Sequence, residues 1–178
     1  ARLHQTVTAT LTDRYPHHDL AQAFTNGAER LKVEPGAGDA RPLSPEMDGV
    51  RTVFNREFAE GISTSIRAGV TAAAGSDAVL IALGDMPLVS VQTVRRLIAA
   101  FNPTEHRSII APLYKGQFGN PVLWGAEHFP HLLTLSGDKG ARSLIGALKS
   151  EAVELDVDDA GVLADADTTE ALDALRKA

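Results

Sequence analysis

The 178-residue sequence contains no cysteine, which excludes disulfide bonds, thiolate metal sites and a cysteine nucleophile. It also lacks any apolar run near the ~20 residues that a transmembrane helix requires. The opening segment ARLHQTVTATLTDRYPHH has no hydrophobic region of the kind found in signal peptides. The lack of cysteine does not fix the compartment, but the other two absences predict a cytoplasmic protein without a membrane partner.

Positive charge is scarce too. Lys and Arg number 17 against 23 Asp and Glu, which gives a net charge of −6. No basic stripe runs along the chain, so we expect no nucleic-acid partner. The net charge does not exclude small anionic substrates, because a few local donors or a divalent cation can bind phosphate on an acidic protein. The length and a 44% hydrophobic content suit a single domain over residues 1–178.

Several well-known catalytic motifs are missing. The sequence has no Walker A pattern, no G-x-G-x-x-G after a strand, no G-x-S-x-G and no H-E-x-x-H. Its six histidines are scattered, and the adjacent pair His17-His18 suits neither helical nor strand metal geometry. We therefore interpret the histidines as ordinary surface or core residues.

The first fifty residues predict two helices and a long loop. Residues 3–15 can form a helix that Pro16 ends, and residues 19–33 show an apolar face at helical spacing. Residues 34–49 are rich in glycine and proline and are predicted to be a loop, with no strand before it.

From residue 50 onwards, strand and helix patterns alternate. Apolar runs predict strands, and segments with helical periodicity predict helices with Ser63 and Ser90 as N-caps. The strands are expected at 50–55, 77–83, 108–113, 121–124 and 152–157, and the helices at 63–75, 90–101, 138–150 and 168–178. This alternation predicts an α/β, three-layer protein with a mainly parallel sheet and helices on both faces.

The strand DAVLIAL ends on Gly84-Asp85-Met86-Pro87. Ligands of such sheets bind outside the carboxyl ends of the strands, so the Asp85 side chain is expected to face the ligand. A hard carboxylate oxygen suits Mg²⁺, which binds one or two carboxylates together with waters and substrate phosphates. The alternative is that Asp85 only stabilises a turn, since Gly, Asp and Pro are common turn residues.

A second acidic segment lies near the C-terminus. Asp165 and Asp167 are two residues apart and would point the same way in extended backbone. Asp167 also lies three residues before Glu170, the spacing of a capping box. The two roles are compatible, because Asp167 can cap a helix and also lie near a cation.

Glycine and hydroxyl residues open the first helix after residue 50. Gly61, Ser63, Thr64 and Ser65 come at its start, where free N–H groups and the positive end of the dipole favour phosphate or ribose oxygens.

Two further loops carry candidate binding residues. Gly137 and Asp138 precede Lys139 and Arg142, whose charges oppose the dipole preference of a helix start and so favour an anion-binding loop. In the second loop, 119–121, the side chain of Asn120 can bond a base or pterin edge, or it can stabilise its own turn.

Five segments in order resemble the molybdenum cofactor cytidylyltransferases, a group related to the molybdopterin-guanine dinucleotide synthases. The segments are NREFAEGISTSIRAGV, AVLIALGDMPLVS, IIAPLYKGQFGNPVLWG, LSGDKGARSLI and DVDDAGVLADADTTEAL, which together span roughly residues 55–175. The resemblance implies a nucleotide-diphospho-sugar transferase-like domain. It also implies Mg²⁺-dependent transfer of a nucleoside monophosphate, CMP from CTP, to molybdopterin with release of pyrophosphate.

The resemblance also implies roles for residues. Asp85 is the catalytic metal-binding carboxylate, and Asp167 lies by the same metal. The substrate-binding residues come from three loops: Gly61, Ser63 and Ser65; Gly119, Asn120 and Pro121; Gly137 and Asp138. A molybdoenzyme or its maturation chaperone is a further candidate partner.

Residues 1–49 depart from the family pattern. The family begins with a strand that runs into the Gly-rich loop Leu-Ala-Ala-Gly, followed by Ser-x-Arg-Met-Gly, and residues 1–49 contain neither. We therefore expect the NTP-binding segment and a central strand to be missing. Two alternatives stay open: a nucleotidyltransferase of the same fold with another NTP or acceptor, and a truncated or degenerate relative without catalysis.

Overall fold

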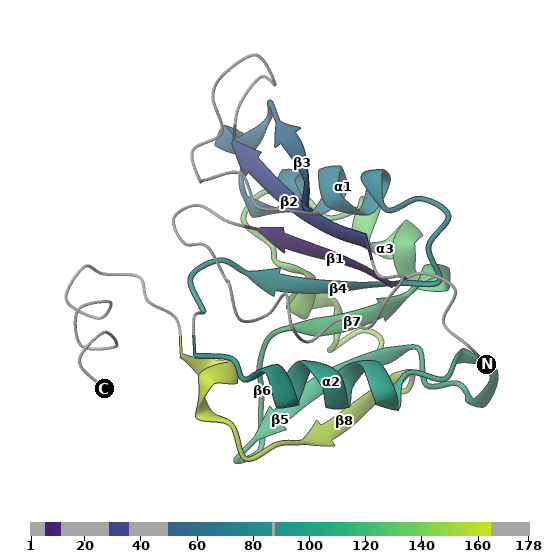
Figure 1. Ribbon diagram of the computed structural model, residues 1–178. Helices are drawn as coiled ribbons and strands as arrows, with labels where there is room; N and C mark the ends of the chain where they lie inside the picture. Colours follow the sequence, from purple (N-terminus) through teal and green to yellow (C-terminus); the bar gives the residue numbers. More distant parts are fainter. Residues whose placement is uncertain (1–5, 12–28, 36–49, 87, 165–178) are drawn as a thin grey trace, which may run out of the picture.

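The computed structural model describes residues 6–11, 29–35, 50–86 and 88–164 (Figure 1). Its centre is one sheet in the order β3-β2-β1-β4-β7-β5-β6, with β8 pairing with β5. The strands are β1 (Thr6–Leu11), β2 (Glu29–Pro35), β3 (Val50–Asn55), β4 (Ala78–Leu83), β5 (Ile109–Tyr114), β6 (Gln117–Phe118), β7 (Val122–Gly125) and β8 (Ala152–Asp156).

The sheet is mixed. Strands β3, β2, β1 and β4 are parallel, as are β5 and β8. Strand β7 is antiparallel to both β4 and β5, and β6 returns antiparallel along β5. The carboxyl ends of the parallel strands therefore meet at one edge of the sheet, here called the carboxyl edge. The segment that enters β7 lies at the same edge, because β7 runs the opposite way.

Helices cover both faces, which confirms the predicted α/β three-layer class. Helices α1 (Ile62–Ala72) and α3 (Phe129–Leu133) lie on one face and α2 (Val91–Ala100) on the other (Figure 1). Val79 and Ile81 of β4 belong to the core under α1 and α3, whereas Ala78, Leu80 and Ala82 belong to the core under α2.

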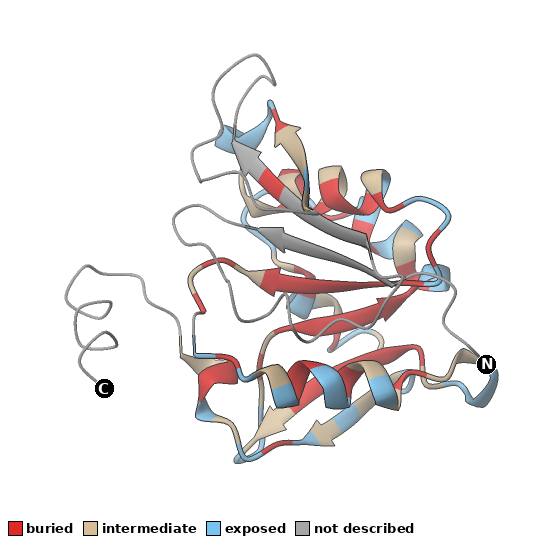
Figure 2. Cartoon of the chain, viewed as in Figure 1, coloured by how far each residue is buried: buried red, intermediate tan, exposed pale blue. Residues whose placement is uncertain are grey.

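The burial pattern explains why β4 reads as an unbroken apolar run. Successive side chains of a strand point to opposite faces, and both faces of this strand are covered (Figure 2). Helix α2 shows the complementary pattern, with Val94 and Leu97 fully buried and Arg95 and Arg96 exposed. Burying a side chain such as Leu97 contributes roughly 1.5–3 kcal/mol.

The helix predicted over residues 3–15 is wrong, because residues 6–11 form strand β1. The segment TVTATL contains three threonines and a valine, whose β-branched side chains favour strands. The helix predicted over residues 19–33 is also wrong at its end, where β2 begins at Glu29. Residues 12–28 and 36–49 lie outside the described residues.

These two strands overturn the expectation of a missing central strand. Strand β1 pairs in parallel with both β2 and β4, at the centre of the parallel half of the sheet. Strand β2 includes the first residues of the glycine-rich segment, so a strand does precede that segment.

One further predicted helix and two predicted N-caps lie within the described residues. The helix predicted at 138–150 is wrong: this segment holds a short 3-10 turn, η5 (Ala141–Leu144), with glycines on either side at 140 and 146. Ser63 is not an N-cap, because α1 begins at Ile62 with Gly61 in that position. Ser90 does cap α2, accepting a hydrogen bond from the amide of Thr93 at 3.1 Å.

The predicted C-terminal helix at 168–178 lies outside the described residues, as do Asp165 and Asp167. Within the described ranges, no helix has the length and apolar character needed to cross a membrane.

Candidate active site

Asp85 lies directly beyond the carboxyl end of β4. The amide of Met86 donates to the carbonyl of Leu83 at 3.4 Å and closes the turn, and the Met86 side chain is buried in the core under α2. The Asp85 side chain is half-buried. Strand β4 also marks the change from the parallel half of the sheet to the antiparallel half. The carboxylate is thus held at the edge where α/β proteins bind ligands.

The chemistry of Asp85 fits a Mg²⁺ ion that is bound together with nucleotide. Among the described residues there is no group of three or more His, Cys, Asp or Glu side chains that could hold a metal alone. Mg²⁺ needs only one or two carboxylates when phosphates and water complete its octahedron. A single carboxylate at this edge is therefore a suitable ligand set for a metal that arrives with an NTP.

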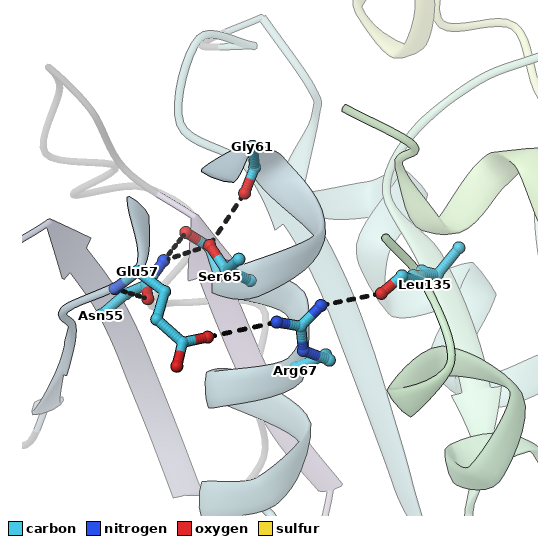
Figure 3. Close-up of polar contacts among 7 residues, drawn as sticks. Asn55, Glu57, Gly61, Ser65, Arg67 and Leu135 are labelled. Carbon is cyan, nitrogen blue, oxygen red and sulfur yellow. Dashed lines mark hydrogen bonds and ion pairs between the residues drawn. The ribbon is translucent and has the colours of Figure 1, made fainter. Parts of the chain in front are cut away.

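The turn from β3 into α1 is built around Asn55, a buried residue that the sequence reasoning missed. Its Nδ2 atom donates to Thr64 Oγ1 at 2.7 Å and to Ser65 Oγ at 2.9 Å, while its Oδ1 atom accepts from the amide of Glu57 at 2.9 Å (Figure 3). Thr64 Oγ1 in turn donates to the carbonyl of Gly61 at 2.8 Å. Asn55 thereby fixes the start of α1 against the end of β3.

Gly61 and the 137–138 loop are brought together by this turn. Gly61 has a φ of +108°, and a Cβ there would overlap the backbone of Gly137 and the carboxylate of Asp138. The amide of Ser63 donates to the carbonyl of Gly137 at 3.2 Å. Two of the predicted binding loops, far apart in sequence, therefore form one continuous surface.

The hydroxyl residues of this surface differ in exposure. The Ser63 side chain is fully buried, and its Oγ atom has no hydrogen-bond partner among the residues that the structure describes. The side chain of Thr64 is also buried, whereas that of Ser65 is half-exposed. Ser65 is therefore the best placed of the three hydroxyls to meet a ligand.

Arg67 connects the same surface to the segment after α3. Its guanidinium donates to the carbonyl of Leu135 at 2.8 Å and to the carboxylate of Glu57 at 3.2 Å (Figure 3). The bond to Leu135 fixes the chain two residues before Gly137. Arg67 is half-buried, and nothing in its sequence position marks this role.

The third loop, Gly119–Pro121, enters β7 at the carboxyl edge. The amide of Asn120 donates to the carbonyl of Val162 at 2.9 Å, and a Cβ at Gly119 would overlap the Val162 side chain. Val162 belongs to the 3-10 turn η6 (Ala160–Leu163), which follows β8. The Asn120 side chain is half-buried.

Arg142 and Lys139 are placed differently from the expectation of a helix start. Arg142 is exposed and donates to the carbonyl of Phe118 at 3.1 Å, and Lys139 is exposed. Because η5 is only four residues long, the helix-dipole argument for an anion site at residues 139–142 does not apply.

Asp159 is another residue that the sequence reasoning missed. Its carboxylate accepts from Thr93 Oγ1 at 2.6 Å and from the amides of Ser90 at 3.0 Å and Gly161 at 2.9 Å. Burial alone would raise the pKa of Asp159, but these hydrogen bonds outweigh it and lower the pKa. Its spacing to Gly161, two residues on, is that of an Asx turn, the one local signal that could have identified it.

The mixed sheet with helices on both faces is a fold shared with solved structures. A solved structure with this fold is Rv0371c of Mycobacterium tuberculosis in complex with manganese, at a TM-score of 0.76 and 23% identity, covering 99% of this chain and 100% of that chain. A solved nucleotidyl transferase shares the fold too.

The sequence model of the MobA-like NTP transferase domain matches residues 10–153, which is more than half of the chain. The chain belongs to this family of nucleotidyltransferase domains. The match begins inside β1 and therefore includes β2 and the rest of the parallel half of the sheet.

Two curated relatives match part of the chain. The purine catabolism protein PucB of Bacillus subtilis is 35% identical, over 67% of this chain and 58% of that protein. The nicotine blue oxidoreductase of Paenarthrobacter nicotinovorans is 31% identical, over 70% of this chain and 63% of that protein. The chain thus spans about three fifths of the length of these relatives.

Proposed function

We propose that the chain transfers a nucleoside monophosphate, CMP from CTP, to the phosphate of molybdopterin and releases pyrophosphate, with Mg²⁺ as the metal. The observation that carries this proposal is the position of Asp85. Its carboxylate follows a buried central strand at the carboxyl edge, in a chain of the MobA-like NTP transferase family. The manganese in the Rv0371c structure supports a divalent metal in this fold.

In the proposed reaction, a phosphate oxygen of molybdopterin attacks the α-phosphorus of the NTP. The bond from that phosphorus to the oxygen bridging to the β-phosphate breaks, and pyrophosphate leaves with the electron pair. The acceptor phosphate is itself the nucleophile, so no cysteine or histidine nucleophile is needed. A Mg²⁺ ion held by Asp85 would offset the negative charge that the reacting phosphates bring together.

The chain's own residues bind and position the two substrates. Asp85 holds the metal, and we assign a second metal contact to Asp167. Gly61 and Ser65 adjoin Gly137 and Asp138 on one continuous surface, which is suited to ribose and phosphate oxygens. The Asn120 side chain is suited to the edge of a base or pterin, because its amide both donates and accepts. Ser63 contributes through the hydrogen bond from its backbone amide to the carbonyl of Gly137, which shapes this surface.

The names of the relatives motivate two alternatives. PucB is named for purine catabolism and the second relative for an oxidoreductase activity. A nucleotidyltransferase with another NTP or acceptor has the same requirement for Asp85. An oxidoreductase would need a redox cofactor, and the sequence has no Gly-rich dinucleotide motif after a strand.

The test is pyrophosphate release from a panel of CTP, GTP, ATP and UTP, with molybdopterin and Mg²⁺, for wild type and Asp85→Asn. We expect turnover with CTP, and a loss of about 100-fold or more in Asp85→Asn because the charge that binds the metal is gone. Asp77→Asn, an exposed residue at the opposite end of β4, is the matched control and keeps full activity.

Each contrary result has a distinct meaning. Turnover with GTP alone would replace CTP in the proposal. Equal Mg²⁺-dependent nucleotide binding in wild type and Asp85→Asn would remove the metal role of Asp85. Absence of nucleotide binding to the folded wild-type chain would identify a non-catalytic relative.

A further inference from the structure

The η6 turn touches both loops that flank β4 and β7 at the carboxyl edge. On one side, a Cβ at Gly161 would overlap the backbone of Leu88, three residues after Asp85. On the other side, the Val162 carbonyl accepts from the amide of Asn120 at 2.9 Å. One four-residue turn therefore sets the spacing between the Asp85 loop and the Gly119–Pro121 loop.

Asp159 holds this turn in place. It is the N-cap of η6 through its bond from the Gly161 amide, and its other oxygen accepts from Thr93 Oγ1 and the Ser90 amide at the start of α2. Helix α2 is ten residues long, so a carboxylate at its N-terminus gains from the dipole. Charge-assisted hydrogen bonds are also stronger than neutral ones. Figure 1 shows η6, in yellow, beside the segment that enters α2.

We infer that Asp159 is a positioning residue for nucleotide binding. Its carboxylate fixes η6 against α2, and η6 holds the Asp85 loop and the Asn120 loop at the separation that the nucleotide requires. This inference rests on the proposed function, because it assigns a role within the same site. Asp159 does not touch the reacting groups and acts through the two loops.

The first arm of the test is steady-state kinetics below the unfolding temperature. In Asp159→Asn, the KM for the NTP is expected to rise about tenfold, because the lost charge-assisted bonds release η6. Thr93→Val removes the 2.6 Å bond to Asp159 and the 3.0 Å bond from Ser90 Oγ, but it keeps the Asp159 charge and its two bonds from backbone amides. It should raise KM in the same direction but less. Asp158→Asn is the matched control: this neighbouring exposed carboxylate has the same charge, and its substitution should leave KM unchanged.

A merely structural role gives a different pattern. It would lower the fraction of active protein, and so the apparent kcat, without changing the KM of the molecules that remain folded. An unchanged KM in both Asp159→Asn and Thr93→Val would overturn the inference.

The second arm does not depend on turnover. Amide hydrogen exchange in Asp159→Asn should accelerate at Ser90, Gly161 and Asn120, while the amides of β4 remain protected as in wild type. Unchanged exchange at Asn120 would break the link between Asp159 and that loop and overturn the inference. If exchange changes as expected but wild type binds no nucleotide, the proposed function fails while the mechanical link stands.

Discussion

Asn55 illustrates how one side chain can organise a whole turn. It ends β3, and its amide satisfies two hydroxyls of α1 and one backbone amide, all within hydrogen-bond distance. The sequence gives little sign of this role, because an Asn before a turn commonly bonds to its own backbone. Only the close approach of β3 and α1 lets Asn55 donate to residues nine and ten positions further along the chain.

Replacing Asn55 by alanine should lower the free energy of unfolding by about 2–3 kcal/mol, because Thr64, Ser65 and the Glu57 amide lose a buried partner. Urea denaturation measures the change. Asn102→Ala is the matched control, because within the described ranges the Asn102 side chain has one hydrogen bond, accepted from the exposed Thr104 hydroxyl. That variant should lose less than about 1 kcal/mol. Equal losses of unfolding free energy in the two variants would show that the Asn55 hydrogen bonds stabilise the fold no more than the exposed Asn102 hydrogen bond does.

At the scale of elements, the candidate site is built where loops meet rather than within any one helix or strand. Gly61 precedes α1 and contacts Gly137, which follows α3. The η6 turn, after β8, contacts the segments before α2 and before β7. Each of these contacts joins segments that are distant in sequence, so their local patterns could indicate loops but not which loops adjoin.

The variants Gly61→Ala and Gly75→Ala separate the free-energy cost of backbone strain from the cost of steric overlap between two loops. Both glycines have positive φ, +108° and +90°, but a Cβ at Gly75 would meet no atom of the described part of the chain within 4 Å. Gly75→Ala should therefore cost only backbone strain, about 1–2 kcal/mol. Gly61→Ala adds overlap with the Gly137 backbone and should cost about 3 kcal/mol or more.

Thermal or urea unfolding measures both Gly variants. Nucleotide binding should weaken in Gly61→Ala and remain intact in Gly75→Ala, because only the first displaces the 137–138 loop. A similar loss of stability in both variants would mean that the Gly61 loop moves freely away from Gly137.

At the scale of the whole molecule, one buried histidine links stability to pH. His128 is 2% exposed, and its Nε2 atom lies 2.8 Å from Ser108 Oγ. Burial lowers the pKa of His128 below 6.5; the nearby Glu127 and Glu151 oppose the shift, and His131, stacked on the ring, adds to it. Ser108 precedes β5, so this pair lies at the edge of the sheet opposite Asp85.

The free energy of unfolding should fall as the pH is lowered from about 7.5 through 6.5. Over this range the unfolded chain takes up a proton that the folded chain refuses, so each pH unit costs up to about 1.4 kcal/mol. The loss levels off once the pH drops below the lowered pKa of the folded protein. His128→Gln should remove this dependence, whereas His106→Gln, at an exposed position, should preserve it. A pH dependence that survives in His128→Gln would assign it to other groups.

The sequence predicted much of the architecture from residue 50 onwards. Strands β3, β4, β5, β7 and β8 and helices α1 and α2 carry strong local signals: buried apolar runs, helical periodicity and, in Ser90, a true cap. The order of the motifs also predicted the nucleotidyltransferase family, which the comparison with known proteins confirms. Strands, helices and caps depend mainly on residues that are close in sequence, so local sequence patterns can predict them.

Tertiary structure decided how the strands pair and which loops meet at the candidate site. The pairing of β1 with β4 and of β2 with β3 follows from chain packing. The segment TVTATL does alternate threonine with an apolar residue, a local strand signal that the helix prediction overlooked. The contacts of Gly61 with Gly137 and of Asp159 with Ser90 likewise join residues more than sixty positions apart. Composition and local pattern thus determined which residues could form the site, while chain packing determined which of them meet, because such contacts leave no signal between sequence neighbours.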